Sequence, residues 1–193
     1  PNAGTATVNG ENILGVSQRA IRAKGVSLVP EDRMLYGIAS DATIEENMIS
    51  DRCDAKRLNK GLLFDMKAIH KEVDQLIADY TVLCKSSRQK VGSLSGGNIQ
   101  KVVVAREFSN SPCLIIADQP TRGIDVGAKY EIYQLILDLA RDGKGVIMVS
   151  SEMPELLGIC DRILVMSGGR LAGEVDAANT SQEEILTLAA KYV

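Results

Sequence analysis

Three short groups of residues between positions 94 and 125 have side chains and spacing that suit phosphate and divalent-cation chemistry. The first is a glycine-rich turn, Leu94, Ser95, Gly96 and Gly97, which precedes a run that predicts a helix. The amides at a helix N-terminus lack partners and carry partial positive charge, and glycine lets an anion approach, so this turn suits a phosphate. Taken alone, the same residues are also compatible with a simple helix cap.

Two carboxylates follow this turn. Asp118 ends the apolar run 114–118, which predicts a buried strand, and a carboxylate at such a strand end can hold the water shell of Mg²⁺. Asp125 follows Arg122 and Gly123 in a second tight turn. The alternative for Asp118 is that it caps the turn after the strand.

The order and spacing of these groups resemble the signature, Walker B and D-loop region of the ABC-type ATPases. The string PTRGIDVGAKYEIYQLI at 120–136, with SSEMPELLG at 150–158, resembles the second nucleotide-binding domain of bacterial sugar-importer ATPases of the ribose and galactose type. The resemblance runs from about residue 5 to the end of the chain. It implies that Asp118 binds Mg²⁺ through water, and that Glu31 lies in the Q-loop, which couples the nucleotide site to a membrane partner.

The resemblance further implies that the signature turn contacts ATP held by a second domain. The residues expected to bind nucleotide are Leu94, Ser95, Gly96, Gly97, Asn98, Asp125 and Glu31. A bulky side chain at Gly97 is expected to block this approach and to leave the fold intact.

Two positions of the hydrolytic apparatus depart from the family pattern. Gln119 stands where ABC ATPases normally have the glutamate that polarises the attacking water, and an amide cannot accept that proton. Losing a general base typically costs about 10²- to 10⁴-fold in rate. Ser151 stands where a histidine commonly contacts the γ-phosphate. We therefore expect a hydrolytic site that is degenerate at these two catalytic positions, and whether the chain hydrolyses ATP stays open.

The phosphate-binding P-loop, G-x-x-x-x-G-K-[S/T], does not occur in the sequence. The pair Gly143-Lys144 lacks both the first glycine and the final hydroxyl residue. In the resembled family the P-loop precedes the stretch that matches residues 4–13, so we expect residues 1–193 to form a single, N-terminally incomplete ABC domain. ATP and Mg²⁺ are then cofactors of the complete protein, and this chain alone is expected to bind ATP weakly or not at all.

The strands and helices expected around the candidate site residues indicate an α/β fold. Buried strands are predicted by the apolar runs 26–29, 114–118, 146–149 and 162–166. Helices are predicted at 17–23, 66–83 and 128–141. This alternation favours a mostly parallel sheet covered by helices, which with the resemblance gives a partial ABC-ATPase, P-loop NTPase-like fold.

Two further parts complete the predicted architecture. Residues from about 41 to 100, which begin with the capping box Thr43-x-x-Glu46, are expected to form a helical subdomain that displays the signature turn. Within it, 52–65 is interpreted as loop or frayed helix. Turns at 9–10 and 167–169 indicate a small antiparallel piece.

The overall composition argues against several classes of protein. The 193 residues carry a net charge of −3, which argues against a nucleic-acid partner. No run of about 18 apolar residues and no signal peptide occur. The four scattered cysteines are interpreted as reduced thiols of a cytoplasmic protein.

The function that the resemblance implies is the ATP-binding, energy-coupling subunit of a bacterial ABC sugar importer, which supplies its signature turn and D-loop to an ATP-sandwich dimer. The implied partners are a second nucleotide-binding domain, transmembrane permease subunits and, indirectly, a periplasmic sugar-binding protein. The permease would hold it peripherally on the inner face of the membrane. Alternatives are a non-catalytic structural or regulatory ABC module, and a soluble ABC ATPase of DNA repair or translation, which the negative charge and missing heptads disfavour.

Overall fold

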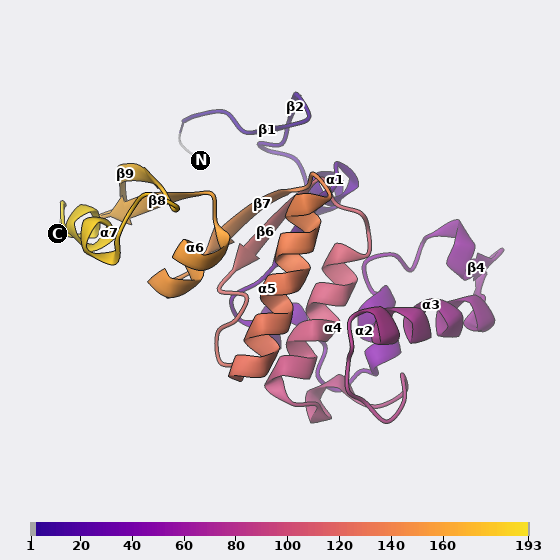
Figure 1. Ribbon diagram of the computed structural model, residues 1–193. Helices are drawn as coiled ribbons and strands as arrows, with labels where there is room; N and C mark the ends of the chain where they lie inside the picture. Colours follow the sequence, from indigo (N-terminus) through magenta and orange to yellow (C-terminus); the bar gives the residue numbers. More distant parts are fainter. Residues whose placement is uncertain (1–2, 193) are drawn as a thin grey trace. The chain divides into compact units, whose positions relative to one another are not determined.

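The computed structural model describes residues 3–192, and the chain divides into two compact units, Pro1–Ile147 and Met148–Val193 (Figure 1). The first unit holds the glycine-rich turn and both carboxylates. It begins with a small hairpin of β1 (Thr7–Val8) and β2 (Glu11–Asn12), followed by the helix α1 (Gln18–Ala23). The residues at the hairpin turn, Asn9 and Gly10, both have positive φ, as a tight two-residue turn requires.

A three-stranded sheet in the order β3-β6-β7 forms the centre of the fold. Its strands are β3 (Val26–Val29), β6 (Leu114–Asp118) and β7 (Gly145–Val149). Strands β3 and β6 are parallel, with Val29 opposite Ala117. Their carboxyl ends therefore lie at the same edge, which places the residues after β3 beside those after β6.

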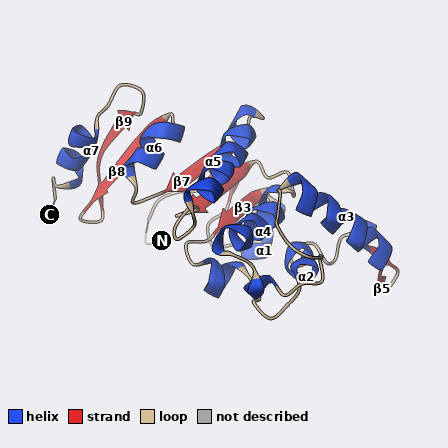
Figure 2. Cartoon of the chain, turned by 60° about the horizontal axis from the view of Figure 1, so that its bottom comes forward, coloured by secondary structure: helices blue, strands red, loops and turns tan. Residues whose placement is uncertain are grey.

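Two long helices cover one face of this sheet, α4 (Gly96–Phe108) and α5 (Val126–Arg141). Figure 2 shows both helices lying along the strands. Their shared core consists of Val29, Val103, Val104, Phe108, Ile115, Ile132 and Ile136. The predicted α/β fold with a parallel sheet and covering helices is confirmed.

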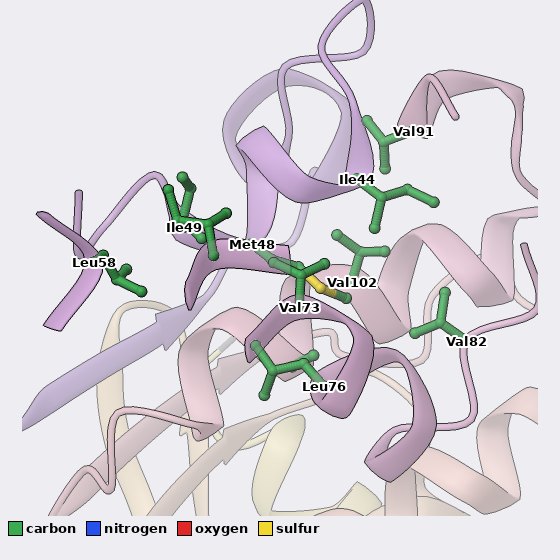
Figure 3. Close-up of a cluster of buried hydrophobic side chains, with 11 residues drawn as sticks. Ile44, Met48, Ile49, Leu58, Val73, Leu76, Val82, Val91 and Val102 are labelled. Atoms are coloured by element: carbon green, nitrogen blue, oxygen red, sulfur yellow. The ribbon is translucent and has the colours of Figure 1, made fainter. Parts of the chain in front are cut away.

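A second core lies among the helices between β3 and β6. Helix α2 (Ile44–Ile49) starts at the predicted capping box, in which Thr43 and Glu46 satisfy each other's backbone amides. Helix α3 (Met66–Asp79) packs on it, and Figure 3 shows Met48, Val73 and Val102 of α4 meeting between them. The N-terminal part of α4 is thereby fixed to this helical part, while its C-terminal part packs on the sheet.

The interpretation of 52–65 as loop or frayed helix is wrong in part. A short 3₁₀ turn, η2 (Lys56–Leu58), leads into a hairpin of β4 (Asn59–Lys60) and β5 (Leu63–Phe64). Two further short turns are the π-helical η1 (Arg33–Gly37) and the 3₁₀ turn η3 (Val91–Ser93). None of these turns has the alternation or helical periodicity that would reveal it in the sequence.

The second unit contains the predicted antiparallel pair. Strands β8 (Arg162–Ser167) and β9 (Arg170–Asp176) form a hairpin, with the helices α6 (Met153–Ile159) and α7 (Gln182–Ala189). Its core consists of Ile163, Val165, Ala177 and Ile185. Across residues 3–192, no helix is both long and apolar enough to cross a membrane.

Candidate functional site

Side-chain hydrogen bonds fix the glycine-rich turn at the start of α4. Ser95 is the N-cap, and its Oγ accepts hydrogen bonds from the backbone N of Asn98 (3.4 Å) and from Asn98 Nδ2 (2.8 Å). Asn98 Oδ1 in turn accepts from the backbone N of Leu83 at 2.7 Å. Leu94 packs against the helical core, while Ser95 is exposed. The hydroxyl proton of Ser95 therefore stays available for a ligand outside the turn.

Helices α4 and α5 lie in close contact at their N-termini. A Cβ atom at Gly97 would lie 2.6 Å from Cβ of Ala128 and 3.3 Å from Oδ2 of Asp125. Asp125 is the N-cap of α5, and its Oδ1 accepts from the backbone N of Ala128 at 3.0 Å. The structure thus brings two of the predicted site residues, Gly97 and Asp125, side by side. The expectation that bulk at Gly97 leaves the fold intact is wrong, because the added atoms meet the chain's own α5 first.

Gly97→Ala is therefore expected to destabilise the first unit by about 1–3 kcal/mol, the usual cost of overpacking. The matched control is Gly158→Ala in α6, where a Cβ meets nothing within 4 Å. There the same exchange is expected to be neutral or to stabilise by up to about 1 kcal/mol. Urea unfolding measures both effects. Adding Ala128→Gly should relieve the clash, and failure of this second change to recover stability would contradict the packing explanation.

The end of β6 leads directly into a strained turn. Asp118 is half-buried at the last position of the strand, and Gln119 follows with φ of +47°, a left-handed conformation that is uncommon outside glycine. Two hydrogen bonds hold this turn: Gln100 Nε2 of α4 donates to the Pro120 carbonyl at 2.7 Å, and the Arg122 amide donates to the Gln119 carbonyl at 3.0 Å. Backbone strain of this kind persists where the surroundings over-determine it, often at functional sites.

The residues after β3 hold the turn that precedes Asp125. Arg33 donates from Nη1 to the Arg122 carbonyl (2.6 Å) and from Nη2 to the Gly123 carbonyl (3.0 Å). Glu31 forms an ion pair with the side chain of Arg122. A Cβ atom at Gly96 would lie 2.9 Å from Arg33 Nη2, so the guanidinium also borders the glycine-rich turn. Arg33 thereby joins three segments of the candidate site.

Sequence reasoning missed Arg33 and Gln100. Gln100 is 2% exposed, and a buried amide needs a partner, but in the sequence it stands beside the polar Lys101, so nothing local marks it as buried. For Arg33 no local signal exists, because its partners lie 89 and 90 positions away.

Ser151 belongs to the second unit and is exposed. Beside it, Ser150 Oγ donates to Glu155 Oε2 at 2.8 Å and accepts from the Glu152 amide at 2.9 Å, which fixes the turn before α6. The role expected for Ser151 stays a prediction.

The ionisable side chains restrict the metal chemistry. Over residues 3–192, no group of three or more His, Cys, Asp or Glu could hold a metal ion. Mg²⁺ is commonly bound through one or two carboxylates, several waters and substrate phosphates, so it needs no such group, and the role of Asp118 as its ligand stays a prediction. The four cysteines are free thiols. Burial raises the pKa of the Cys160 thiol, and the negative charge of Asp161 raises it further.

A family model described as "ABC transporter" matches residues 1–122, more than half of the chain. The chain belongs to the ABC transporter family. It is 48% identical over 191 residues to the galactose/methyl galactoside import ATP-binding protein MglA of Mannheimia succiniciproducens, covering 99% of this chain and 38% of that protein. It is 51% identical over 169 residues to MglA of Pasteurella multocida, covering 88% of this chain and 33% of the relative. The chain thus spans about two fifths or less of the length of these curated relatives.

A solved structure confirms the ABC fold. The ATP-binding cassette MJ0796, described as a dimer in a post-hydrolysis state bound to ADP and Pi, superposes with a TM-score of 0.75 at 22% identity. The match covers 93% of this chain and 76% of MJ0796. The family resemblance drawn from the motifs between residues 94 and 136 is confirmed, including its similarity to sugar-importer ATPases.

Proposed function

We propose that this ABC chain belongs to the energy-coupling ATPase of a bacterial sugar importer. Its relatives are named for galactose and methyl galactoside import, which supports a sugar as the cargo of the complete transporter. The proposed role of the chain is to supply the glycine-rich turn and the Asp125 turn to ATP held by the P-loop of a second nucleotide-binding domain.

The closeness of Gly97 and Asp125 carries this proposal. Two helix N-termini lie against each other there, and the first-turn amides that Ser95 and Asp125 leave uncapped carry partial positive charge. Ser95 would donate its hydroxyl, and Gly97 its backbone amide, to the γ-phosphate. Arg33 stabilises this arrangement, because it binds the carbonyls of Arg122 and Gly123 beside Gly96.

ATP hydrolysis that depends on this chain's own Asp118 and Gln119 would be slow. Asp118 would hold Mg²⁺ through water, and the ion would neutralise phosphate charge when nucleotide is bound. Gln119 can orient a water through its amide but cannot take the proton from it. This difference favours one second candidate function, a non-catalytic ABC module that lends only its glycine-rich turn to a partner's ATP.

The permease is proposed to dock beside η1. Met34, Leu35 and Tyr36 are 47%, 67% and 74% exposed on this turn, an unusual gathering of large apolar side chains at the surface. A shallow hollow of about 470 Å³ lies next to them, between η1 and α2. Because Arg33 begins the same turn and binds the turn before Asp125, a shift of η1 would reach the nucleotide surface directly.

Ser95→Asp in the complete transporter tests the proposed function. Aspartate also caps helices, so the fold of α4 should persist, but its negative charge would face the γ-phosphate. We expect ATP turnover to fall about 10²-fold, the usual loss when one phosphate or oxyanion donor is removed. Ser181→Asp is the matched control, because Ser181 caps α7 through an equivalent bond to the Glu184 amide. Normal turnover in Ser95→Asp would mean that the turn is only a helix cap.

A further inference from the structure

The β4–β5 hairpin presents large apolar side chains to solvent. Leu62 is 103% exposed, Leu63 75%, Phe64 51% and Met66 47%. We call these four residues the apolar tip. Soluble surfaces rarely gather large apolar residues in consecutive positions, so the apolar tip calls for a partner.

The residues on either side of the β4–β5 hairpin are anchored to the rest of the first unit. Leu58, directly before β4, is 1% exposed and packs in the helical core with Ile69 and Val73 of α3. Asp65, directly after β5, caps α3 by accepting from the amides of Lys67 and Ala68. Between these anchors the strands pair only at 59–60 and 63–64. Leu62, Leu63 and Phe64 therefore belong to a short hairpin that has both ends tied to the core, and Met66 follows it as the first residue of α3.

The charge around the apolar tip differs in sign from that of the whole chain. Residues 54–72 contain five lysines and arginines but three acidic residues, a net charge of +2, whereas the whole chain carries −3. All three acids already have partners: Asp54 pairs with Arg19, Asp65 with Lys60, and Glu72 with Arg57. Three exposed lysines nearby form no ion pair within residues 3–192, namely Lys56, Lys67 and Lys71.

We propose that the apolar tip inserts into the interfacial layer of an anionic lipid membrane, with the three unpaired lysines on the lipid headgroups. A few apolar side chains joined to a basic patch form a recognised combination for reversible membrane binding. A specific protein interface usually covers about 800 Å² on each partner and uses about 20–30 residues, far more than the four residues of the apolar tip. A fluid lipid surface accepts the apolar tip without a matching groove. The proposal uses family membership, which places the chain in a membrane transporter, but no feature of the nucleotide site.

Tryptophan fluorescence tests the insertion directly, since the chain contains no tryptophan. The probe is Leu62→Trp in the full chain, mixed with vesicles of phosphatidylcholine alone or of phosphatidylcholine and phosphatidylglycerol in equal parts. We expect a blue shift of the emission with the anionic vesicles only. Leu171→Trp is the control, because Leu171 is a comparably exposed leucine (55%) that lies outside residues 54–72 in the sequence. No shift for Leu62→Trp, or an equal shift for Leu171→Trp, would overturn the proposal.

Vesicle co-sedimentation then separates the apolar and charged contributions. The double substitution Leu62→Ser with Leu63→Ser should lower the partition coefficient at least about tenfold, because it removes the inserting side chains. Lys67→Gln should lower it about fivefold, and Lys85→Gln, at an exposed lysine outside 54–72, should change little. Unchanged binding of the double variant would overturn the proposal. A blue shift of the Leu62→Trp emission that appears only when permease protein is present would also overturn the proposal. That result would assign the apolar tip to a protein partner.

Discussion

Replacing Gln119 by glutamate is expected to raise the ATP turnover of the complete protein by about 10²- to 10⁴-fold, because a carboxylate at this position can act as the general base. The two side chains have nearly the same size and shape, and position 119 directly follows Asp118 at the end of β6. The turn that orients the side chain is fixed by Gln100 and by the Arg122 amide, neither of which is altered by the substitution. The gain should therefore appear in kcat, with the KM for ATP little changed.

Steady-state hydrolysis of Mg-ATP by the transporter measures this effect, and Gln119→Gly is the matched control. Because φ at this position is +47°, glycine should relieve about 1 kcal/mol or more of backbone strain, yet it supplies no base. A rise in turnover with glutamate but not with glycine assigns the effect to proton transfer. If glutamate leaves turnover unchanged while the natural chain already cycles at a transporter's rate, position 119 does not have the proposed role.

The sequence predicted those elements whose signals are local. The capping box of Thr43 and Glu46 places the start of α2, and the periodic run from residue 66 places the start of α3. The π-helical turn at Arg33 and the 59–64 hairpin escaped prediction for a physical reason. In the hairpin, the consecutive apolar residues Leu62, Leu63 and Phe64 all remain exposed, so neither helical periodicity nor strand alternation describes them.

For the candidate site, the order of the motifs correctly indicated which segments lie together. It did not predict which side chains of those segments contact one another. The glycine-rich turn and Asp125 were expected to act at one surface, and the structure places Gly97 next to Asp125. The contact of Gly97 with Ala128, by contrast, depends on how closely α4 and α5 pack. Arg33 was missed for the same kind of reason, because its carbonyl partners become neighbours only once β3 and β6 are paired.

The largest expected loss of stability comes from Glu107→Ala. Glu107 is 1% exposed near the end of α4, where it accepts hydrogen bonds from Arg22 of α1 at 2.8 Å and from Arg106 Nε at 3.0 Å. Arg22 also contacts Asp51, which binds Arg52 Nε at 2.9 Å. Burial by itself lowers the pKa of the Arg22 guanidinium, but Glu107 and then Asp51 outweigh it and raise that pKa. The carboxylate of Glu107 is thus the main compensation for a cation between α1 and α4.

Truncating one partner of a fully buried ion pair typically costs about 3–5 kcal/mol, out of the roughly 5–15 kcal/mol that stabilises an ordinary domain. Because the Arg22 side chain is 37% exposed and also pairs with Asp51, water and Asp51 offset part of this cost, and we expect a loss of about 2–4 kcal/mol. Urea unfolding of the full chain measures the loss. Asp138→Ala is the control, because Asp138 pairs with Arg141 at 2.9 Å on the surface of α5 and should cost about 0–1 kcal/mol. Equal costs for the two variants would show that water already screens the Glu107 pair.

The same substitution has a consequence for the nucleotide surface. Ser95 caps the N-terminus of α4, and Glu107 anchors the last turn of that helix to α1. A rigid helix transmits a change at one end to the other, here over about 18 Å at 1.5 Å per residue. In Glu107→Ala, hydrogen exchange should therefore rise in the last turn of α4 first, and at the amides of Asn98 and Ile99, which both bond to Ser95, only if the whole helix shifts. Faster exchange at residues 98–99 with the core strand β6 still protected would show that the Arg22–Glu107 ion pair positions the glycine-rich turn as well as stabilising the fold.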